Sequence, residues 1–173
     1  MTTLKRSKRA RRMRLVVEPG GTVVITAPAG LPERAIARFL TEHAAWIERA
    51  RARMRDRKAL PVRGRRAYLA HREDARQLVT AMVERWSRFY GLPYGRIAIK
   101  DTTSLWGSCS RRGNLNFSYK LLFLPRELAE YVVAHEVCHL AHHDHGPRFW
   151  GLVSRGMPEY RRMRTELRKY VLR

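Results

Sequence analysis

The sequence predicts an α+β fold, with short β-hairpins and amphipathic helices in separate stretches of the chain. β-branched residues gather in short runs bounded by glycine and proline, which is typical of strands and turns. Longer segments carry apolar residues at helical spacing. With 173 residues and a hydrophobic content of 45%, the chain suits a globular protein with a proper core.

The N-terminal stretch combines a basic segment with a predicted hairpin. Residues 1–14 include seven basic residues and could be a flexible arm, the end of which runs into the first strand. Residues 14–18 and 22–26 are β-branched runs, and Pro19-Gly20-Gly21 between them indicates a turn. A helix then starts at Leu31-Pro32-Glu33, because proline and an acidic residue favour the first turn.

This first helix keeps its apolar spacing to about Met54 and passes into a basic linker around residues 60–66. A second helix is predicted over residues 71–90 and a strand over residues 96–100. Residues 104–121 then predict a second hairpin, with its turn at Arg111-Arg112-Gly113-Asn114.

The motif His135-Glu136-Val137-Cys138-His139 carries the strongest functional signal. Pro125 and Glu127 predict a helix start ahead of it. Residues four apart lie on one face of a helix, so His135 and His139 can each give one imidazole nitrogen to a single Zn²⁺. Glu136 is one step round the helix, where a general base sits in zinc hydrolases. The alternative, solvated histidines at a helix end, leaves these residues on an apolar segment unexplained.

Catalytic zinc takes three protein ligands, and His145 is our prediction for the third. Asp144 favours a turn and Gly146-Pro147 starts a new helix, so the chain can double back to the metal. The metzincin pattern H-E-x-x-H-x-x-G-x-x-H has the same spacing, but His142 stands where that pattern has glycine. The alternatives for the third ligand are His142, His143, Asp144, Glu159 and Glu166.

Two further helices are predicted after the motif, starting near Pro147 and Met157. Phe149 and Trp150 of the first are expected to pack under the metal site. In zinc peptidases a strand with a free edge borders the metal cleft and can pair with an extended peptide, and the hairpin at residues 104–121 is placed for that role.

The charge is high and uneven. The formal net charge is +21, and residues 1–66 carry 18 Lys/Arg against 5 Asp/Glu. A basic half of this kind suggests nucleic acid or another polyanion as a partner. An arginine-rich proteome would produce the same surface without such a function.

Cysteine content and hydropathy point to the cytoplasm. Two cysteines do not make a disulfide framework, no apolar run is long enough to cross a membrane, and the N-terminus lacks the apolar region of a secretory signal. We therefore expect no membrane partner, and the sequence does not indicate an oligomeric state.

The chain resembles the YgjP-like metallopeptidases, which are relatives of the SprT-like and WLM zinc peptidases. The resemblance covers nearly the whole chain and rests on the N-terminal hairpin and helix with Trp46, on Trp-Gly-Ser-Cys-Ser at 106–110, on residues 113–116, on Val133–Leu140, and on residues 145–150. Leu105 departs from it, because such proteins commonly have arginine before the tryptophan.

The resemblance implies a zincin-like domain, in which a small twisted sheet packs beside the H-E-x-x-H helix. It also implies His135, His139 and His145 as metal ligands and Glu136 as the catalytic base. We expect a basic N-terminal hairpin-plus-helix part at residues 1–66 and a catalytic part at residues 67–173.

The expected function is zinc-dependent hydrolysis of a protein or peptide substrate. The positive net charge would suit substrate proteins that are bound to nucleic acid. One alternative is a metal-dependent nucleoside triphosphate pyrophosphatase, although no phosphate-cradling glycine motif is present. Another is a nucleic-acid-binding module with a structural zinc site, which would need a fourth protein ligand such as Cys109 or Glu159.

Overall fold

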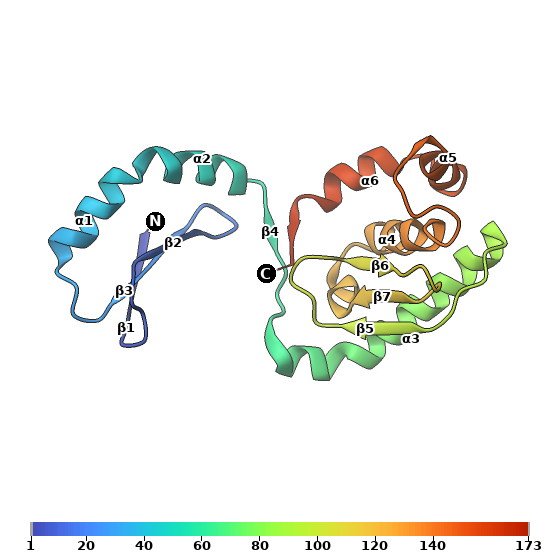
Figure 1. Ribbon diagram of the computed structural model, residues 1–173, viewed down its shortest axis with the longest axis horizontal. Helices are drawn as coiled ribbons and strands as arrows, with labels where there is room; N and C mark the ends of the chain where they lie inside the picture. The colour runs from blue at the N-terminus through green and yellow to red at the C-terminus, as the bar shows by residue number, and fades with distance from the viewer. Residues whose placement is uncertain (1, 173) are drawn as a thin grey trace. The chain divides into compact units, whose positions relative to one another are not determined.

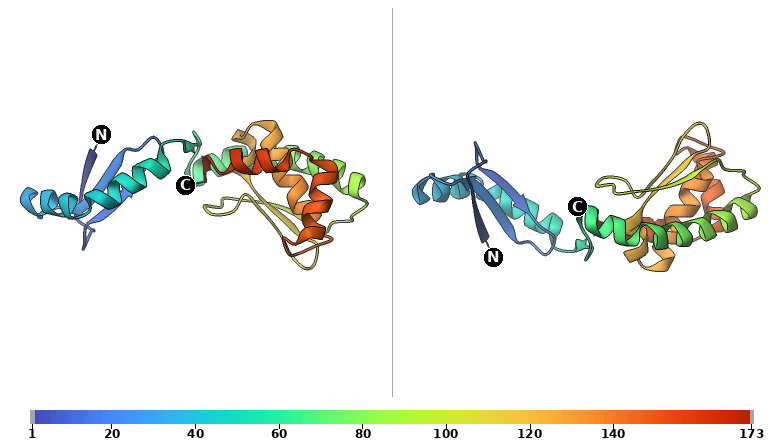
Figure 2. Two further views of the ribbon diagram at one scale, coloured as in Figure 1. Left: turned by 90° about the horizontal axis from the view of Figure 1, so that it is seen from above. Right: turned by 90° about the horizontal axis from the view of Figure 1, so that it is seen from below.

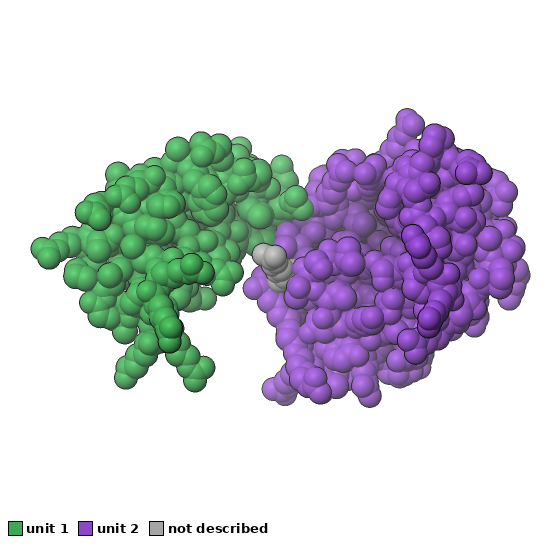
Figure 3. Space-filling model, viewed as in Figure 1, with its two compact units in different colours: residues 1–58 green, residues 59–173 purple. Residues whose placement is uncertain are grey.

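The computed structural model describes residues 2–172 and divides the chain into two compact units, Met1–Lys58 and Ala59–Arg173 (Figures 1 and 3). Both units mix helices with small sheets, so the predicted α+β class is confirmed. The boundary that the charge pattern suggested, at residue 66, falls inside the first turn of a helix that begins at Gly64.

The first unit is a three-stranded sheet packed against two helices. Strand β3 (Val23–Pro28) is central, with β2 (Arg14–Val17) antiparallel on one side and β1 (Thr2–Ser7) parallel on the other. The predicted hairpin is thus confirmed as β2–β3. Helices α1 (Glu33–Glu42) and α2 (Ala44–Met54) cover one face of the sheet through two apolar clusters.

Two expectations for this unit were wrong. The basic N-terminal segment is an edge strand and not an arm, because its backbone pairs with β3 while Arg6 donates to the carbonyl oxygens of Ala29 and Leu31. Charged side chains suit an edge strand, since they discourage pairing with another chain. The single helix expected to about Met54 is interrupted at His43, which ends α1 and begins α2.

The second unit is built on helices α3 (Gly64–Tyr90) and α4 (Arg126–Cys138), which contact each other and one sheet (Figure 2). Helix α3 starts seven residues earlier than predicted. It ends at Tyr90 and is followed by Gly91 in the left-handed conformation, which is common after a helix C-terminus. Its buried face and that of α4 form the main core with the sheet. That core includes Val79, Val83, Trp86, Leu115, Phe117, Val133 and Val137.

The sheet of the second unit has the order β5–β7–β6. Strand β5 (Ile97–Lys100) runs parallel to β7 (Leu115–Ser118), and β6 (Gly107–Cys109) runs antiparallel to β7 as the second predicted hairpin. The hairpin is shorter than expected, because the chain turns into a 3₁₀ helix, η1 (Tyr119–Phe123), after Ser118. Strand β6 is therefore an edge strand of this sheet, and it contacts α4.

The chain ends in helices α5 (Pro147–Gly156) and α6 (Tyr160–Leu167), both close to the expected positions. A short strand, β8 (Tyr170–Val171), pairs with β4 (Lys58–Ala59). Buried Lys120 secures this end, because its Nζ donates to the Leu172 carbonyl oxygen at 2.7 Å and to that of Thr102 at 3.0 Å, and lies 3.3 Å from the Asp101 carboxylate.

Candidate metal centre

Helix α4 and the turn after it position the site residues. Pro125 precedes the helix and Glu127 lies in its first turn, while the apolar residues ahead of the motif are buried. The helix ends at Cys138, and backbone hydrogen bonds from Leu140, Ala141 and His142 to the last turn reverse the chain. The Asp144 carboxylate accepts a hydrogen bond from the Gly146 amide at 3.1 Å, which is the turn that the sequence indicated.

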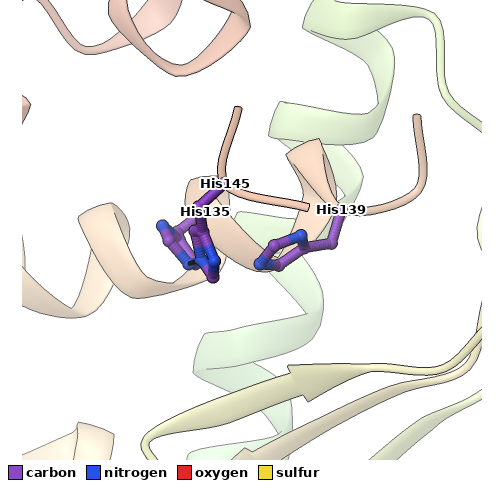
Figure 4. Close-up of side chains that lie close together, drawn as sticks. All are labelled: His135, His139 and His145. Atoms are coloured by element: carbon purple, nitrogen blue, oxygen red, sulfur yellow. Dashed lines mark hydrogen bonds between the residues drawn. The ribbon is translucent and has the colours of Figure 1, made fainter. Parts of the chain in front are cut away.

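This reversal brings His145 to the two helical histidines (Figure 4). One ring nitrogen from each of His135, His139 and His145 lies within 4.8 Å of the others, and the Nε2 atoms of His135 and His145 are 3.1 Å apart. Three nitrogens about 2.1 Å from a tetrahedral zinc ion would lie roughly 3.4 Å apart, so the spacing suits a metal.

The ring orientation of His139 is set by its backbone neighbour His142. Nδ1 of His139 lies 2.8 Å from the His142 carbonyl oxygen, so this nitrogen carries the proton and donates it there. Nε2 is then the nitrogen with a free lone pair, as a metal ligand needs. His142 thus orients His139 through its backbone carbonyl, and its own ring does not belong to the group of three converging histidines.

Burial keeps the two helical histidines in the form that binds metal. Desolvation, then the neighbouring His139 and His145, lower the pKa of His135 to about 3. Desolvation also lowers the pKa of His139. Nδ1 of His135 is buried without a hydrogen-bond partner among the described residues. Converging imidazole nitrogens are a donor set that suits zinc and other first-row transition metals.

Aromatic side chains of α5 hold the three rings in place. Phe149 is fully buried and stacks on His139 at a centroid distance of 4.4 Å, while its ring also contacts those of His135 and His145 at 4.9 Å. Trp150 stacks on His145 at 5.6 Å. The expectation that both aromatics pack at this site is confirmed.

Glu136 is buried beside the edge strand. Only 7% of the residue is exposed, and burial raises the pKa of its carboxyl to about 8. A Cβ atom built on Gly107 of β6 would lie 2.6 Å from Cγ of Glu136 and 3.0 Å from Oε1. Glycine at this position therefore gives the Glu136 side chain its space. The spacing of residues within the H-E-x-x-H motif could not reveal the contact between Gly107 and Glu136. The glycine inside the strand-forming stretch Trp-Gly-Ser-Cys-Ser was the sequence signal that could have indicated it.

The other candidate ligands lie elsewhere. Glu159 is paired with Arg162 and Glu166 with Lys169. Within residues 2–172 the potential metal-binding group consists of the three histidines alone, without Cys109 or a glutamate as a fourth member. Burial, and then the charge of Glu136, raise the pKa of the Cys109 thiol to about 11.

Comparison with known proteins identifies the family. The model of the YgjP-like metallopeptidase domain matches residues 11–69 and 63–170, which is most of the chain. The chain belongs to the YgjP-like metallopeptidase family. The expected resemblance is thereby confirmed, and this YgjP-like protein is a metal-dependent hydrolase of the peptidase class.

A solved structure with a similar fold is that of the metallopeptidase zymogen abylysin from Pyrococcus abyssi. It is 21% identical to the YgjP-like chain with a TM-score of 0.48, over 51% of this chain and 90% of that one. No curated protein matches the sequence. Among the described residues, helices with the length and hydropathy of a membrane span are absent.

Proposed function

We propose that this YgjP-like protein is a zinc-dependent peptidase in which His135, His139 and His145 bind the metal and Glu136 is the catalytic base. The observation that carries the proposal is the convergence of three imidazoles next to one buried carboxyl. Three protein ligands leave one position of a tetrahedral zinc open, as in catalytic sites, whereas structural sites are closed by a fourth. A zinc ion held there would act as a Lewis acid and lower the pKa of a nearby water toward neutrality.

Glu136 handles the proton in this proposal. Its carboxylate accepts a proton from the attacking water and returns it to the leaving amine. Burial raises the proton affinity of this carboxyl, and a divalent cation nearby lowers it again. The two effects oppose each other, and acid–base catalysis is most efficient when the pKa of the base lies near the operating pH.

Strand β6 is our candidate for the substrate-binding edge. It is the outer strand of the order β5–β7–β6, contacts α4, and holds Gly107 against Glu136. An extended peptide that added to this edge would lie alongside the base with its backbone hydrogen-bonded to β6. The substrate selected in this way would be an unfolded or extended segment.

The first test compares Glu136→Gln with Glu130→Gln. Both changes remove one carboxylate from α4, but Glu130 forms ion pairs with Arg85 and Arg126 and lies outside the metal group. With casein as substrate and metal content measured in parallel, Glu136→Gln should keep one zinc per chain and lose hydrolysis. Glu130→Gln should keep both.

Hydrolysis that survives Glu136→Gln would remove this residue from the mechanism. Hydrolysis of nucleoside triphosphates in place of casein would move the protein to the pyrophosphatase alternative. Bound zinc with neither activity would favour the module with a structural metal.

We further propose that residues 1–58 bind a polyanion such as single-stranded nucleic acid. This unit carries 15 Lys/Arg against 5 Asp/Glu, and Arg49, Arg53 and Arg55 of α2 and its C-terminal end are exposed together with Trp46. Guanidinium groups neutralise phosphates, and an exposed indole can stack on a base.

Fluorescence anisotropy with labelled single-stranded DNA tests this second proposal. The logarithm of the affinity should fall linearly with the logarithm of salt concentration, with a slope of roughly −0.7 per phosphate contacted. An affinity that does not change with salt would refute it. A rise in casein cleavage when casein is presented on DNA would link the two proposals.

A further inference from the structure

A pocket on α5 and α6 shares Trp150 with the surroundings of the metal centre. It has a volume of about 360 Å³, at the small end of the range for ligand pockets. Its lining consists of two aromatic residues, three arginines and one threonine: Trp150, Tyr160, Arg161, Arg164, Thr165 and Arg168. This composition combines flat apolar walls with several guanidinium groups.

The arginines give the pocket a strong positive charge. No acidic residue lines it. Nearby carboxylates form ion pairs with cations that do not line the pocket: Glu159 and Glu127 with Arg162, and Glu166 with Lys169. Within the described chain, Arg161 and Arg164 have no carboxylate partner, and their guanidinium groups lie over the rings of Tyr160 and Trp150. Such a pocket attracts a negatively charged group.

Trp150 connects the pocket to the metal-binding residues. Its indole stacks on His145 at 5.6 Å and on Tyr160 at 5.1 Å, so it is a wall of the pocket and a neighbour of the metal group at once. A group bound in the pocket would therefore share the Trp150 side chain with the metal-binding residues.

We propose that this pocket is a subsite for a carboxylate of the peptide substrate, either the C-terminal carboxylate or an acidic side chain close to the cleaved bond. Guanidinium groups bind carboxylates through paired hydrogen bonds, and the aromatic walls hold the carbon atoms that carry the carboxylate. This subsite rests on the proposed peptidase function, which it deepens by naming a substrate class.

The test uses four fluorogenic peptides with one neutral core sequence. The first pair compares a free C-terminus with an amidated one. The second pair is amidated and compares glutamate with glutamine at the same position, and this comparison is repeated at each position of the core. The wild-type protein should show a kcat/KM about tenfold to a hundredfold higher for the carboxylate peptide than for its neutral partner, as expected for one charge-assisted contact. The pair that shows the difference identifies the source of the carboxylate.

The variants are Arg161→Gln and Arg164→Gln, with Arg162→Gln as the matched control on the same helix. The first two should reduce the ratio of kcat/KM between the carboxylate and neutral peptides toward one, with zinc content unchanged. Arg162→Gln should keep both the activity and the ratio, because Arg162 pairs with Glu127 and Glu159 outside the pocket. Equal rates on all four peptides, or a ratio that survives loss of both arginines, would overturn the subsite.

Binding to the Glu136→Gln variant separates this inference from the proposed function. Tighter binding of the carboxylate peptide than of its neutral partner, without hydrolysis by the wild type, would support the subsite and refute the peptidase. Hydrolysis by the wild type without a preference for the carboxylate peptide would support the peptidase and refute the subsite. Binding of a nucleoside triphosphate that requires Arg161 and Arg164, with no preference among the peptides, would overturn the carboxylate assignment.

Discussion

Gly107→Ala should disable the proposed base without removing it. The added Cβ would lie 2.6 Å from Cγ of Glu136, whereas carbon atoms in contact are about 3.5–4.0 Å apart, so the Glu136 side chain must retreat by roughly 1 Å. Misplacement by about 1 Å can cost roughly a hundredfold in rate. We therefore expect the kcat of casein hydrolysis to fall about a hundredfold while zinc content is retained.

Gly107→Ala should change the free energy of unfolding only slightly, in contrast to its large effect on kcat. Overpacking costs about 1–3 kcal/mol. Gly107 does not have a positive φ, so alanine fits its backbone conformation and regains about 0.4–1 kcal/mol from the unfolded state. The net loss of roughly 1 kcal/mol would lower the melting temperature by a few degrees, which differential scanning calorimetry can measure. A large drop in kcat would then reflect the position of Glu136 and not unfolding.

Gly151→Ala is the matched control. Gly151 lies on α5, and a Cβ atom there would meet nothing within 4 Å. This variant should keep full activity and gain up to about 1 kcal/mol, since alanine is favoured over glycine in a helix. A Gly107→Ala enzyme that hydrolyses casein at the wild-type rate would refute the reasoning.

Three further predictions concern stability, reactivity and metal. Lys120→Met should lower the free energy of unfolding by about 3 kcal/mol, because it leaves a carboxylate and two carbonyl oxygens without their buried partner; an unchanged urea midpoint would contradict this. Cys109 should react with iodoacetamide at pH 8 more than a hundredfold more slowly than free cysteine, because a pKa of about 11 leaves only about 0.1% thiolate, and the rate by mass spectrometry should rise about tenfold per pH unit up to that pKa. Removal of metal by a chelator should lower the melting temperature, and zinc at about a thousand times its dissociation constant should restore about 4 kcal/mol; no shift would argue against a bound metal.

Features that depend on neighbours in sequence could be predicted. The turn Pro19-Gly20-Gly21 indicated the first hairpin, and the spacing of His135 and His139 placed them on one face of a helix. The return of His145 depended on Asp144 and Gly146, which are also local. In each case, a few adjacent residues carry the physical cause, so a single sequence contains the information.

Features that depend on distant partners could not be predicted. The basic residues of β1 look like a solvated arm until β3 offers a backbone to pair with, and that pairing is parallel and far apart in sequence. The contact between Gly107 and Glu136 and the pocket on α6 likewise require the tertiary arrangement. His43 interrupts a helix that the apolar spacing alone would continue, and its Nδ1 lies 2.8 Å from the Phe39 carbonyl oxygen at that break.

The three histidines differ in when they can come together during folding. His135 and His139 are one helical turn apart and face the same way as soon as α4 forms, whereas His145 lies beyond the turn that follows α4 and its ring contacts Phe149 of α5. A folding intermediate with α4 formed and α5 undocked would therefore offer two nitrogens and bind metal weakly. Tight metal binding would then report that α5 has docked, and an ion present during folding would hold α5 in its docked position.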